Sequence, residues 1–196
     1  MNKVEMTKLL FKELKPIAVK AGYAEDVVYG MIAQSWQEGI LSGLAEKYHN
    51  YWGMKAGVKY KGKTVAMNNK AGNDPAVYRA FDNITEGCKG YIKFLSYKRY
   101  DCLHDCTTAE DFLSNIGKAG WNSNPSYGSH CMSHLQQVRF ICNNDIVDTS
   151  PDAYTAVALK VIKGMYGNGA YRRQKLTMEG YNYKQVQQRV NEILNK

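Results

Sequence analysis

The stretch VVYGMIAQSWQEGILSGLAEKYHNYWGMK, residues 27–55, decides the fold of this chain. Apolar residues recur at helical spacing along its first half. The two residues before it, Glu25 and Asp26, are acidic, as suits a helix N-terminus, and Gly39 supplies a helix stop. The pattern therefore predicts a helix that begins near residue 25 and carries Glu38 in its last turn.

Glu38 has two physical reasons to hold its proton. Partial burial against apolar neighbours disfavours the charged carboxylate, and so does the negative end of the helix dipole. A glycosidase needs a general acid in this kind of environment. A solvated glutamate at a helix end is the alternative interpretation of the same residue.

Two blocks of this region resemble the glucosaminidases of glycoside hydrolase family seventy-three. They are QSWQE at residues 34–38 and LAEKYHNYWGMK at residues 44–55. The second block matches the family pattern closely, whereas the segment 39–43 is shorter than in the family and lacks its Gly-Trp-Gly. Further similarity occurs at 78–82, 87–91, 97–100 and 120–127, so the resemblance spans about residues 5–140.

Patterns along the first 140 residues indicate helices around a small β excursion. We expect an amphipathic helix over 3–21 that Pro16 kinks or divides, and helices near 84–96, 108–117 and 126–140. Residues 58–67 predict a short hairpin that turns near Lys61 and Gly62, followed by a polar loop. The fold class is α+β and mostly helical, and the resemblance implies a lysozyme-like catalytic domain with a cleft.

The last part of the chain predicts a small three-helix C-terminal domain. We expect a catalytic domain over 1–143, a polar linker over 144–152 and the small domain over 153–196. An apolar stripe from Tyr154 to Ile162 ends at Gly164, and a final helix begins near Asn182 with apolar residues facing inward. A unit of this size is near the lower limit for independent folding.

This tail resembles the cell-wall-binding repeat of certain phage lysozymes. The matching segments are VIKGMYGNG at 161–169 and the residues after it up to Asn191. The resemblance implies a muropeptide ligand, with Tyr166 holding an acetamido sugar and Arg172 a peptide carboxylate. Packing between helices and a solvated charge are the alternatives. The other residues expected at this site are Gly167, Gly169 and Tyr181. Only one copy of the repeat is present, so affinity is expected to be modest or to be gained by oligomerisation.

Residues after the catalytic helix supply candidates for sugar binding. Asn50 and Trp52 follow Glu38, and aromatic faces pack against pyranose rings, although Trp52 fits a core position equally well. The resemblance places Tyr100 and Tyr127 near the cleaved bond, and it places Trp121 in a loop beside the cleft, as wall or as core.

The second catalytic group is open. Many family members have a glutamate in the β excursion, but residues 67–75 of this chain contain none. Asp74 is one candidate, as the base of an inverting reaction, although a plain turn aspartate is the alternative. The other candidate is the N-acetyl oxygen of the substrate itself, oriented by the phenol of Tyr127. Neither route needs a metal or an organic cofactor.

Charge and cysteine content bear on partners. Residues 153–196 carry 8 Lys and Arg against 2 Asp and Glu, whereas residues 1–152 carry 18 against 16. A basic tail suits a polyanion such as a bacterial wall polymer, nucleic acid or anionic lipid.

The five cysteines are expected to be reduced and mostly buried, and a zinc site built from Cys102, His104, Cys106, His130, Cys131 and His134 is a minor alternative.

The sequence favours a peptidoglycan hydrolase of the endolysin kind. No apolar run reaches transmembrane length, and the N-terminal residues lack the apolar core of a secretory signal. We therefore expect synthesis in the cytoplasm, action on the wall after release during phage lysis, and no insertion into the membrane. The expected reaction is cleavage of β-1,4 bonds as an endo-β-N-acetylglucosaminidase, or as a muramidase. A non-catalytic wall-binding or assembly protein on a decayed hydrolase fold, and a nucleic-acid-binding tail on an unrelated core, are the alternatives.

Overall fold

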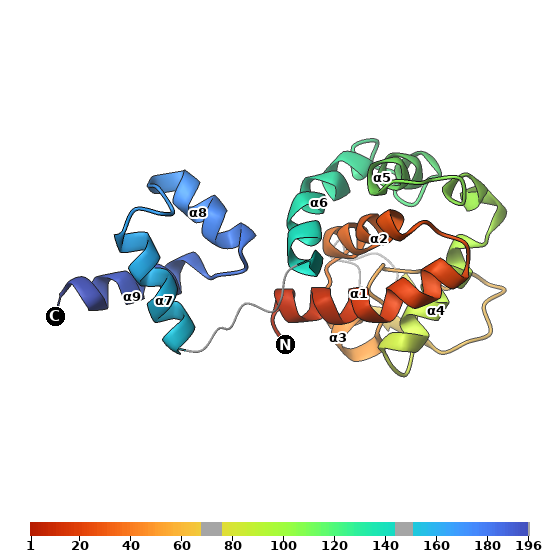
Figure 1. Ribbon diagram of the computed structural model, residues 1–196. Coiled ribbons are helices and arrows are strands. Elements are labelled where there is room, and N and C mark those ends of the chain that lie inside the picture. Colours follow the sequence, from red (N-terminus) through yellow and green to blue (C-terminus); the bar gives the residue numbers. More distant parts are fainter. Residues whose placement is uncertain (68–75, 144–150, 196) are drawn as a thin grey trace. The chain divides into compact units, whose positions relative to one another are not determined.

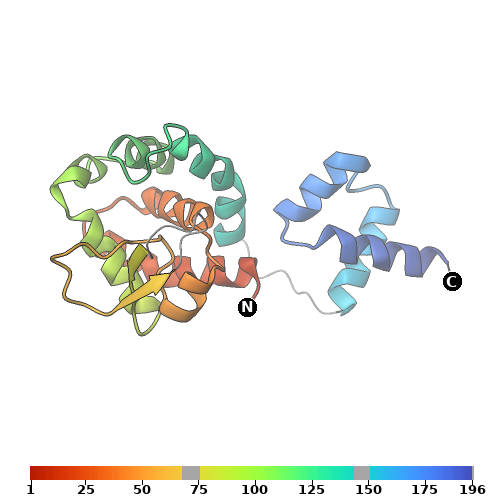
Figure 2. The ribbon, with the colours of Figure 1, turned by 180° about the vertical axis from the view of Figure 1, so that it is seen from behind.

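A computed structural model describes residues 1–67, 76–143 and 151–195 (Figures 1 and 2). The chain separates into two compact units, Met1–Val138 and Arg139–Lys196, and the dividing point lies within helix α6, ahead of the boundary at 143 expected from the sequence. The elements of the first unit, in order, are α1 (Lys3–Lys20), α2 (Glu25–Gln37), α3 (Gly43–Tyr48), β1 (Thr64–Met67), β2 (Ala76–Arg79), α4 (Ile84–Leu95), the 3-10 helix η1 (Lys98–Leu103), α5 (Ala109–Lys118) and the first part of α6 (Tyr127–Asn143).

Helix α2 is the buried centre of the first unit. It packs on α1 and on α5, and both views show it among these helices (Figures 1 and 2). The carboxylate of Asp26 in its first turn accepts a hydrogen bond of 2.8 Å from the backbone N–H of Ala109, at the start of α5. Gly30 lets the two helices approach, because a Cβ atom there would lie 3.0 Å from the carbonyl oxygen of Ala109. The predicted helix, with its apolar residues inward, is confirmed.

Helix α1 runs through Pro16 as a single element, so the division into two helices is wrong. A capping box fixes its start: the Asn2 side chain accepts from the N–H of Glu5, and the Glu5 carboxylate accepts from the N–H of Asn2, both at 2.9 Å. Pro16 lies on the exposed side of the helix, while the residues that face the core are Leu10, Leu14 and Ala18.

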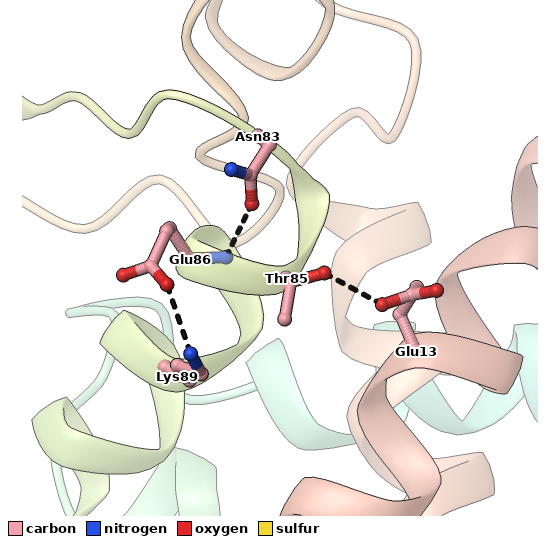
Figure 3. A network of polar contacts seen from close by, with 5 residues as sticks. All are labelled: Glu13, Asn83, Thr85, Glu86 and Lys89. Atoms are coloured by element: carbon pink, nitrogen blue, oxygen red, sulfur yellow. Dashed lines mark hydrogen bonds and ion pairs between the residues drawn. The ribbon is translucent and has the colours of Figure 1, made fainter.

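Helix α4 is attached to α1 by a polar contact near its own start (Figure 3). The side chain of Asn83 caps α4 by accepting from the N–H of Glu86 at 2.9 Å. In the same turn the Thr85 hydroxyl donates to the Glu13 carboxylate of α1 at 2.7 Å, and on the outer face Lys89 pairs with Glu86 at 2.9 Å. The cap that starts α4 therefore also orients it against α1.

The β excursion differs from the predicted hairpin. Strand β1 does not pair with residues 58–61 but runs antiparallel to β2, with Thr64 opposite Arg79. The reason lies in Arg79, whose buried guanidinium donates to the Tyr97 hydroxyl at 2.8 Å and lies 4.3 Å from the Tyr60 ring and 4.6 Å from the Phe94 ring. These long-range contacts hold β2 in place as the partner of β1. Residues 68–75, between the two strands, lie outside the described part of the chain.

The second unit contains α7 (Pro151–Ile162), α8 (Gly169–Met178) and α9 (Tyr183–Leu194) after the end of α6. Its core is formed by residues of all three helices and of the turn after α7: Val157, Ala158, Val161, Tyr166, Leu176, Val186 and Val190. The predicted helices are confirmed, but Ile162 and Leu194 are exposed rather than inward. Among the described residues, no helix combines the length and apolar character needed to cross a membrane.

Gly87 on α4 packs so closely against the backbone after α3 that a larger residue there should destabilise the first unit. A Cβ atom on Gly87 would lie 2.2 Å from the carbonyl oxygen of His49, so Gly87→Ala must displace α4 or the loop after α3. We expect a loss of about 1–3 kcal/mol in the free energy of unfolding, measured by urea denaturation. Gly43→Ala is the matched control, because nothing lies within 4 Å of its Cβ position. Equal stability of the two variants would contradict the packing described.

Candidate active site

Glu38 lies at the wall of a cleft of about 750 Å³ in the first unit. It is the C-cap residue of α2, and Gly39 follows with a φ of +88°, so the chain turns away immediately after the carboxyl group. The cleft is lined by Glu38, Leu44, Gly53, Met54, Lys55, Met67, Tyr78, Phe94, Arg99, Tyr100, Gly120, Trp121, Asn122 and Ser123. The wall thus combines residues from α2, from the loop after α3, from both strands and from the loop after α5.

The surroundings of Glu38 favour its protonated form. Burial raises the pKa of its carboxyl group, and hydrogen bonds from the Tyr127 hydroxyl and the Trp121 side chain lower it by a smaller amount. The Tyr127 hydroxyl lies 2.6 Å from Oε1 of Glu38. A carboxyl group that is largely buried, hydrogen-bonded and open to a cleft can donate a proton to a bound glycoside.

Gly53 forms the wall next to the other carboxyl oxygen. Its φ is +65°, and a Cβ atom on it would lie 2.8 Å from Oε2 of Glu38. Asn50 fixes this turn: its side chain accepts from the N–H of Met54 at 2.9 Å and donates to the carbonyls of Met54 and Arg79 at 3.0 and 2.9 Å. The Asn-x-Trp-Gly segment therefore shapes the backbone beside the acid.

Asn50 and Trp52, which the sequence suggested as substrate-binding residues, do not line the cleft. Their exposed fractions are 1% and 0%. The indole N–H of Trp52 donates to the carbonyl of Met31 at 2.9 Å, and its ring stacks on that of Tyr91 at 3.9 Å. Both side chains act one layer behind the cleft, where they hold the turn that contains Gly53.

Tyr100 and Trp121 do lie at the cleft. Trp121 is half-buried and its ring lies 5.7 Å from that of Tyr100. The loop that carries Trp121 is held by Arg99, whose guanidinium donates to the carbonyls of Ala119, at 3.0 Å, and Gly120. Lys55 and Arg99 also line the cleft and were not among the expected site residues, although both fall within the sequence blocks that resemble the family.

Tyr127 lies behind Glu38 and not in the cleft wall. It is absent from the residues that line the cleft, and its hydroxyl donates to Glu38. The structure therefore places the phenol of Tyr127 against Glu38 rather than in the cleft, where the sequence analysis expected it to orient the substrate's N-acetyl group. Asp74, the other candidate for the second catalytic group, lies outside the described residues.

The zinc alternative finds no support in the described ranges 1–67, 76–143 and 151–195, where no three His, Cys, Asp or Glu residues come together as ligands. The five cysteines are free, and three of them are buried: Cys88, Cys106 and Cys131. Burial raises the pKa of all three thiols, which accordingly behave as small apolar residues.

In the second unit, two of the expected wall-binding side chains serve the fold. Tyr166, expected as a sugar platform, is 4% exposed and packs in the core, and its hydroxyl donates to the Glu179 carboxylate. Arg172 donates to Gly167 O and Asn168 Oδ1, both at 2.8 Å, and thereby fixes the turn between α7 and α8.

The glycines of this turn have the left-handed conformation. Gly167 and Gly169 have φ values of +62° and +56°. Tyr181 is half-buried, with its ring 5.9 Å from that of Tyr154. The exposed aromatic of this region is Tyr171, at 62%, whose ring covers Gly167. Tyr171 was not among the expected residues because it is not part of the repeat pattern, whereas Tyr166 is.

Comparison with known proteins extends these observations. The model of the family described as mannosyl-glycoprotein endo-beta-N-acetylglucosaminidase matches residues 20–140, and the CW_7 repeat matches residues 155–194. Two relatives are described as peptidoglycan hydrolase FlgJ. The one from Vibrio parahaemolyticus is 23% identical over 150 residues, which cover 69% of this chain and 49% of the relative. The one from Salmonella typhimurium is 26% identical over 110 residues, which cover 53% and 35%. The chain thus spans half or less of these relatives.

Solved structures share the fold at low identity. The glycoside hydrolase domain of Salmonella typhimurium FlgJ has a TM-score of 0.56 and 19% identity, over 84% of this chain and 98% of that chain. The catalytic domain of the Listeria monocytogenes autolysin Auto has a TM-score of 0.56 and 16% identity, over 74% and 89%. These likenesses confirm the predicted α+β, mostly helical, lysozyme-like fold. Because the family model covers more than half of the sequence, the chain belongs to the glucosaminidase family of glycoside hydrolases and carries a CW_7 repeat in its second unit.

Proposed function

We propose that this chain is a peptidoglycan hydrolase that cleaves β-1,4 bonds of the wall glycan as an endo-β-N-acetylglucosaminidase. The observation that carries the proposal is the largely buried, hydrogen-bonded carboxyl group of Glu38 at the wall of the cleft. The family match and the names of the relatives, which are peptidoglycan hydrolases, support the substrate class.

The cleavage begins with protonation of the glycosidic oxygen by Glu38 as the sugar ring develops oxocarbenium character. Glu38 then holds a negative charge, which the hydroxyl of Tyr127 and the side chain of Trp121 stabilise by hydrogen bonding. Water finally adds at the anomeric carbon, and its proton returns to Glu38. The leaving glycan keeps the proton it received, so the acid is regenerated.

The described part of the cleft wall contributes one carboxyl group, that of Glu38. This arrangement supports a substrate-assisted route, in which the N-acetyl oxygen of the substrate attacks the anomeric carbon. A phenol that orients this group must belong to a tyrosine at the cleft, which Tyr100 and Tyr78 satisfy and Tyr127 does not. Asp74 as an inverting base is the competing route.

We further propose that the second unit anchors the enzyme to the wall and that the chain acts as a phage endolysin, made in the cytoplasm and released to the wall at lysis. The CW_7 repeat supports the anchor. The basic character of residues 153–196, which contain 8 Lys and Arg but 2 Asp and Glu, also supports it. Tyr171, exposed on α8, supplies an aromatic face of the kind that packs against sugars.

Glu38→Gln should lower kcat on purified peptidoglycan by at least ~100-fold, because an amide cannot deliver a proton. Folding raises the pKa of Glu38, so the stability that its proton contributes is present at low pH and is lost as pH rises through the folded pKa. The variant escapes that loss, and its melting temperature at pH 7 should equal or exceed that of the parent. Release of reducing ends and calorimetry measure the two effects.

Glu46→Gln is the matched control, since Glu46 is exposed on α3 and lies away from the cleft lining. It should retain full activity. An active, folded Glu38→Gln protein would refute the assignment of the acid. If the parent itself released no reducing ends but sedimented with walls, a non-catalytic wall-binding protein would be favoured.

The product anomer distinguishes the two routes for the second group. The substrate-assisted route predicts a retained β anomer, detected by NMR before mutarotation. Asp74→Asn should then cost less than about tenfold in kcat, and Tyr100→Phe should cost more. An inverted product together with an inactive Asp74→Asn enzyme would assign the role to Asp74.

The anchor is tested by dividing the chain. A fragment of residues 150–196 should sediment with peptidoglycan, and residues 1–148 should cleave soluble glycan fragments but lose activity on whole walls. Tyr171→Ala in the full chain should weaken sedimentation while circular dichroism stays unchanged. Salt-sensitive retention of the fragment on DNA, without binding to walls, would instead favour a nucleic-acid-binding tail.

A further inference from the structure

Three buried side chains form a hydrogen-bonded chain that ends at Glu38. The Tyr91 hydroxyl donates to Oε1 of Gln34 at 2.5 Å, Nε2 of Gln34 donates to the Tyr127 hydroxyl at 3.3 Å, and Tyr127 donates to Oε1 of Glu38 at 2.6 Å. Tyr91 lies on α4, Gln34 on α2 and Tyr127 on α6. The chain therefore connects three helices to one oxygen of the acid.

Each link allows one direction of donation. Tyr91 has a single hydroxyl proton, and giving it to Gln34 fixes the carbonyl end of the amide toward α4. The NH₂ end must then point to Tyr127, whose oxygen becomes an acceptor and whose proton is left for Glu38. Burial raises the pKa of both phenols, so they stay neutral donors throughout the working range of the enzyme.

The origin of the chain is rigidly held. The Tyr91 ring stacks on Trp52 at 3.9 Å with an interplanar angle of 10°, and it meets the Trp121 ring edge-on at 5.9 Å. Tyr91 and Gln34 are fully buried. A flip of the Gln34 amide would turn its NH₂ group toward Tyr91, so the Tyr91 hydroxyl proton would lose its acceptor, and it would set the amide carbonyl opposite the oxygen of Tyr127. The fixed Tyr91 ring therefore favours the native orientation.

As a result, the two carboxyl oxygens of Glu38 have different surroundings. Oε1 of Glu38 is occupied by the Tyr127 donor, while Oε2 lies beside Gly53 at the cleft. We propose that Tyr91 is a positioning residue, which through Gln34 and Tyr127 assigns Oε2 of Glu38 as the oxygen that carries and delivers the catalytic proton. This inference rests on the proposed glycoside hydrolase activity.

Tyr91→Phe tests the proposal, since it keeps the stacked ring and removes the hydroxyl. Without that donor the Gln34 amide is free to flip, and its oxygen then takes the Tyr127 proton away from Glu38. Loss of this donor raises the pKa of Glu38, so the alkaline limb of the kcat profile should move upward by about half a pH unit or more. We expect kcat to fall by ~10-fold, the scale of one charge-assisted hydrogen bond, with little change in KM.

Tyr51→Phe is the matched control. It removes another buried hydroxyl, bonded to Nδ1 of His49 at 3.0 Å, from a ring that is edge-on to Trp52 at 6.0 Å and outside the chain. Its kcat profile should match that of the parent. A Tyr91→Phe enzyme whose kcat and alkaline limb equal those of Tyr51→Phe would overturn the proposal. A parent that released no reducing ends would instead refute the proposed function.

A double-mutant cycle tests transmission through the chain. In a Tyr127→Phe background, Tyr91→Phe should shift the alkaline limb no further, because the last link is already missing. Additive shifts would overturn the proposal. Should Tyr91→Phe fail to fold, Tyr127→Phe removes the last donor itself and should move the limb in the same direction; no movement would count against the proposal.

Other titratable and charged groups also lie near Glu38, and they are the same in all the variants. Trp121 donates to it, Cys131 on α6 is a neutral thiol with its pKa raised to about 12, and Lys55 and Arg99 line the cleft with positive charge. None of these is altered in the variants, so a shift of the limb between Tyr91→Phe and Tyr51→Phe reports the chain alone.

Discussion

The proposed role of Glu38 requires a carboxyl group that is buried enough to hold a proton and exposed enough to donate it, and the first unit provides such a position. The carboxyl group lies where a buried helix ends, so one side of it meets the core and the other meets the cleft. Burial raises the pKa of the carboxyl group but does not fix its orientation. The hydrogen bond from the Tyr127 hydroxyl restrains one of its two oxygens. The balance of desolvation and hydrogen bonding sets both its protonation and its direction.

The residues around the acid act mostly through backbone and core. Asn50 and Trp52 are buried and do not line the cleft, yet they hold the turn that brings Gly53 against the carboxyl group. The stack of Trp52 on Tyr91 links this turn to the buried chain that ends at Tyr127. In this chain, Asn50, Trp52 and Gly53 therefore fix the geometry around the Glu38 carboxyl group.

The second unit shows the same separation of roles on a smaller scale. Tyr166 and Arg172, the residues that the repeat pattern singles out, are used to build its core and to fix its first turn. If the second unit binds the wall as proposed, the contact falls to exposed side chains such as Tyr171, which the pattern does not distinguish. A unit with so small a core needs its polar residues for folding, which limits how many are left to bind.

The sequence by itself determined the longer helices, the helix-terminal position of Glu38 and the resemblance to the family, because helical periodicity, caps and stop glycines depend on neighbours within a few residues. It did not indicate the short helices α3 and η1. Only the tertiary structure decided that β1 pairs with β2, that Trp52 faces the core, and that Tyr100 lines the cleft while Tyr127 lies behind the acid. These outcomes depend on contacts such as Arg79 with Tyr97 and Tyr127 with Glu38, whose partners are distant along the chain. A tyrosine has the same local signature whether its ring ends in the core or in the cleft, so its destination is fixed by the helices that pack around it.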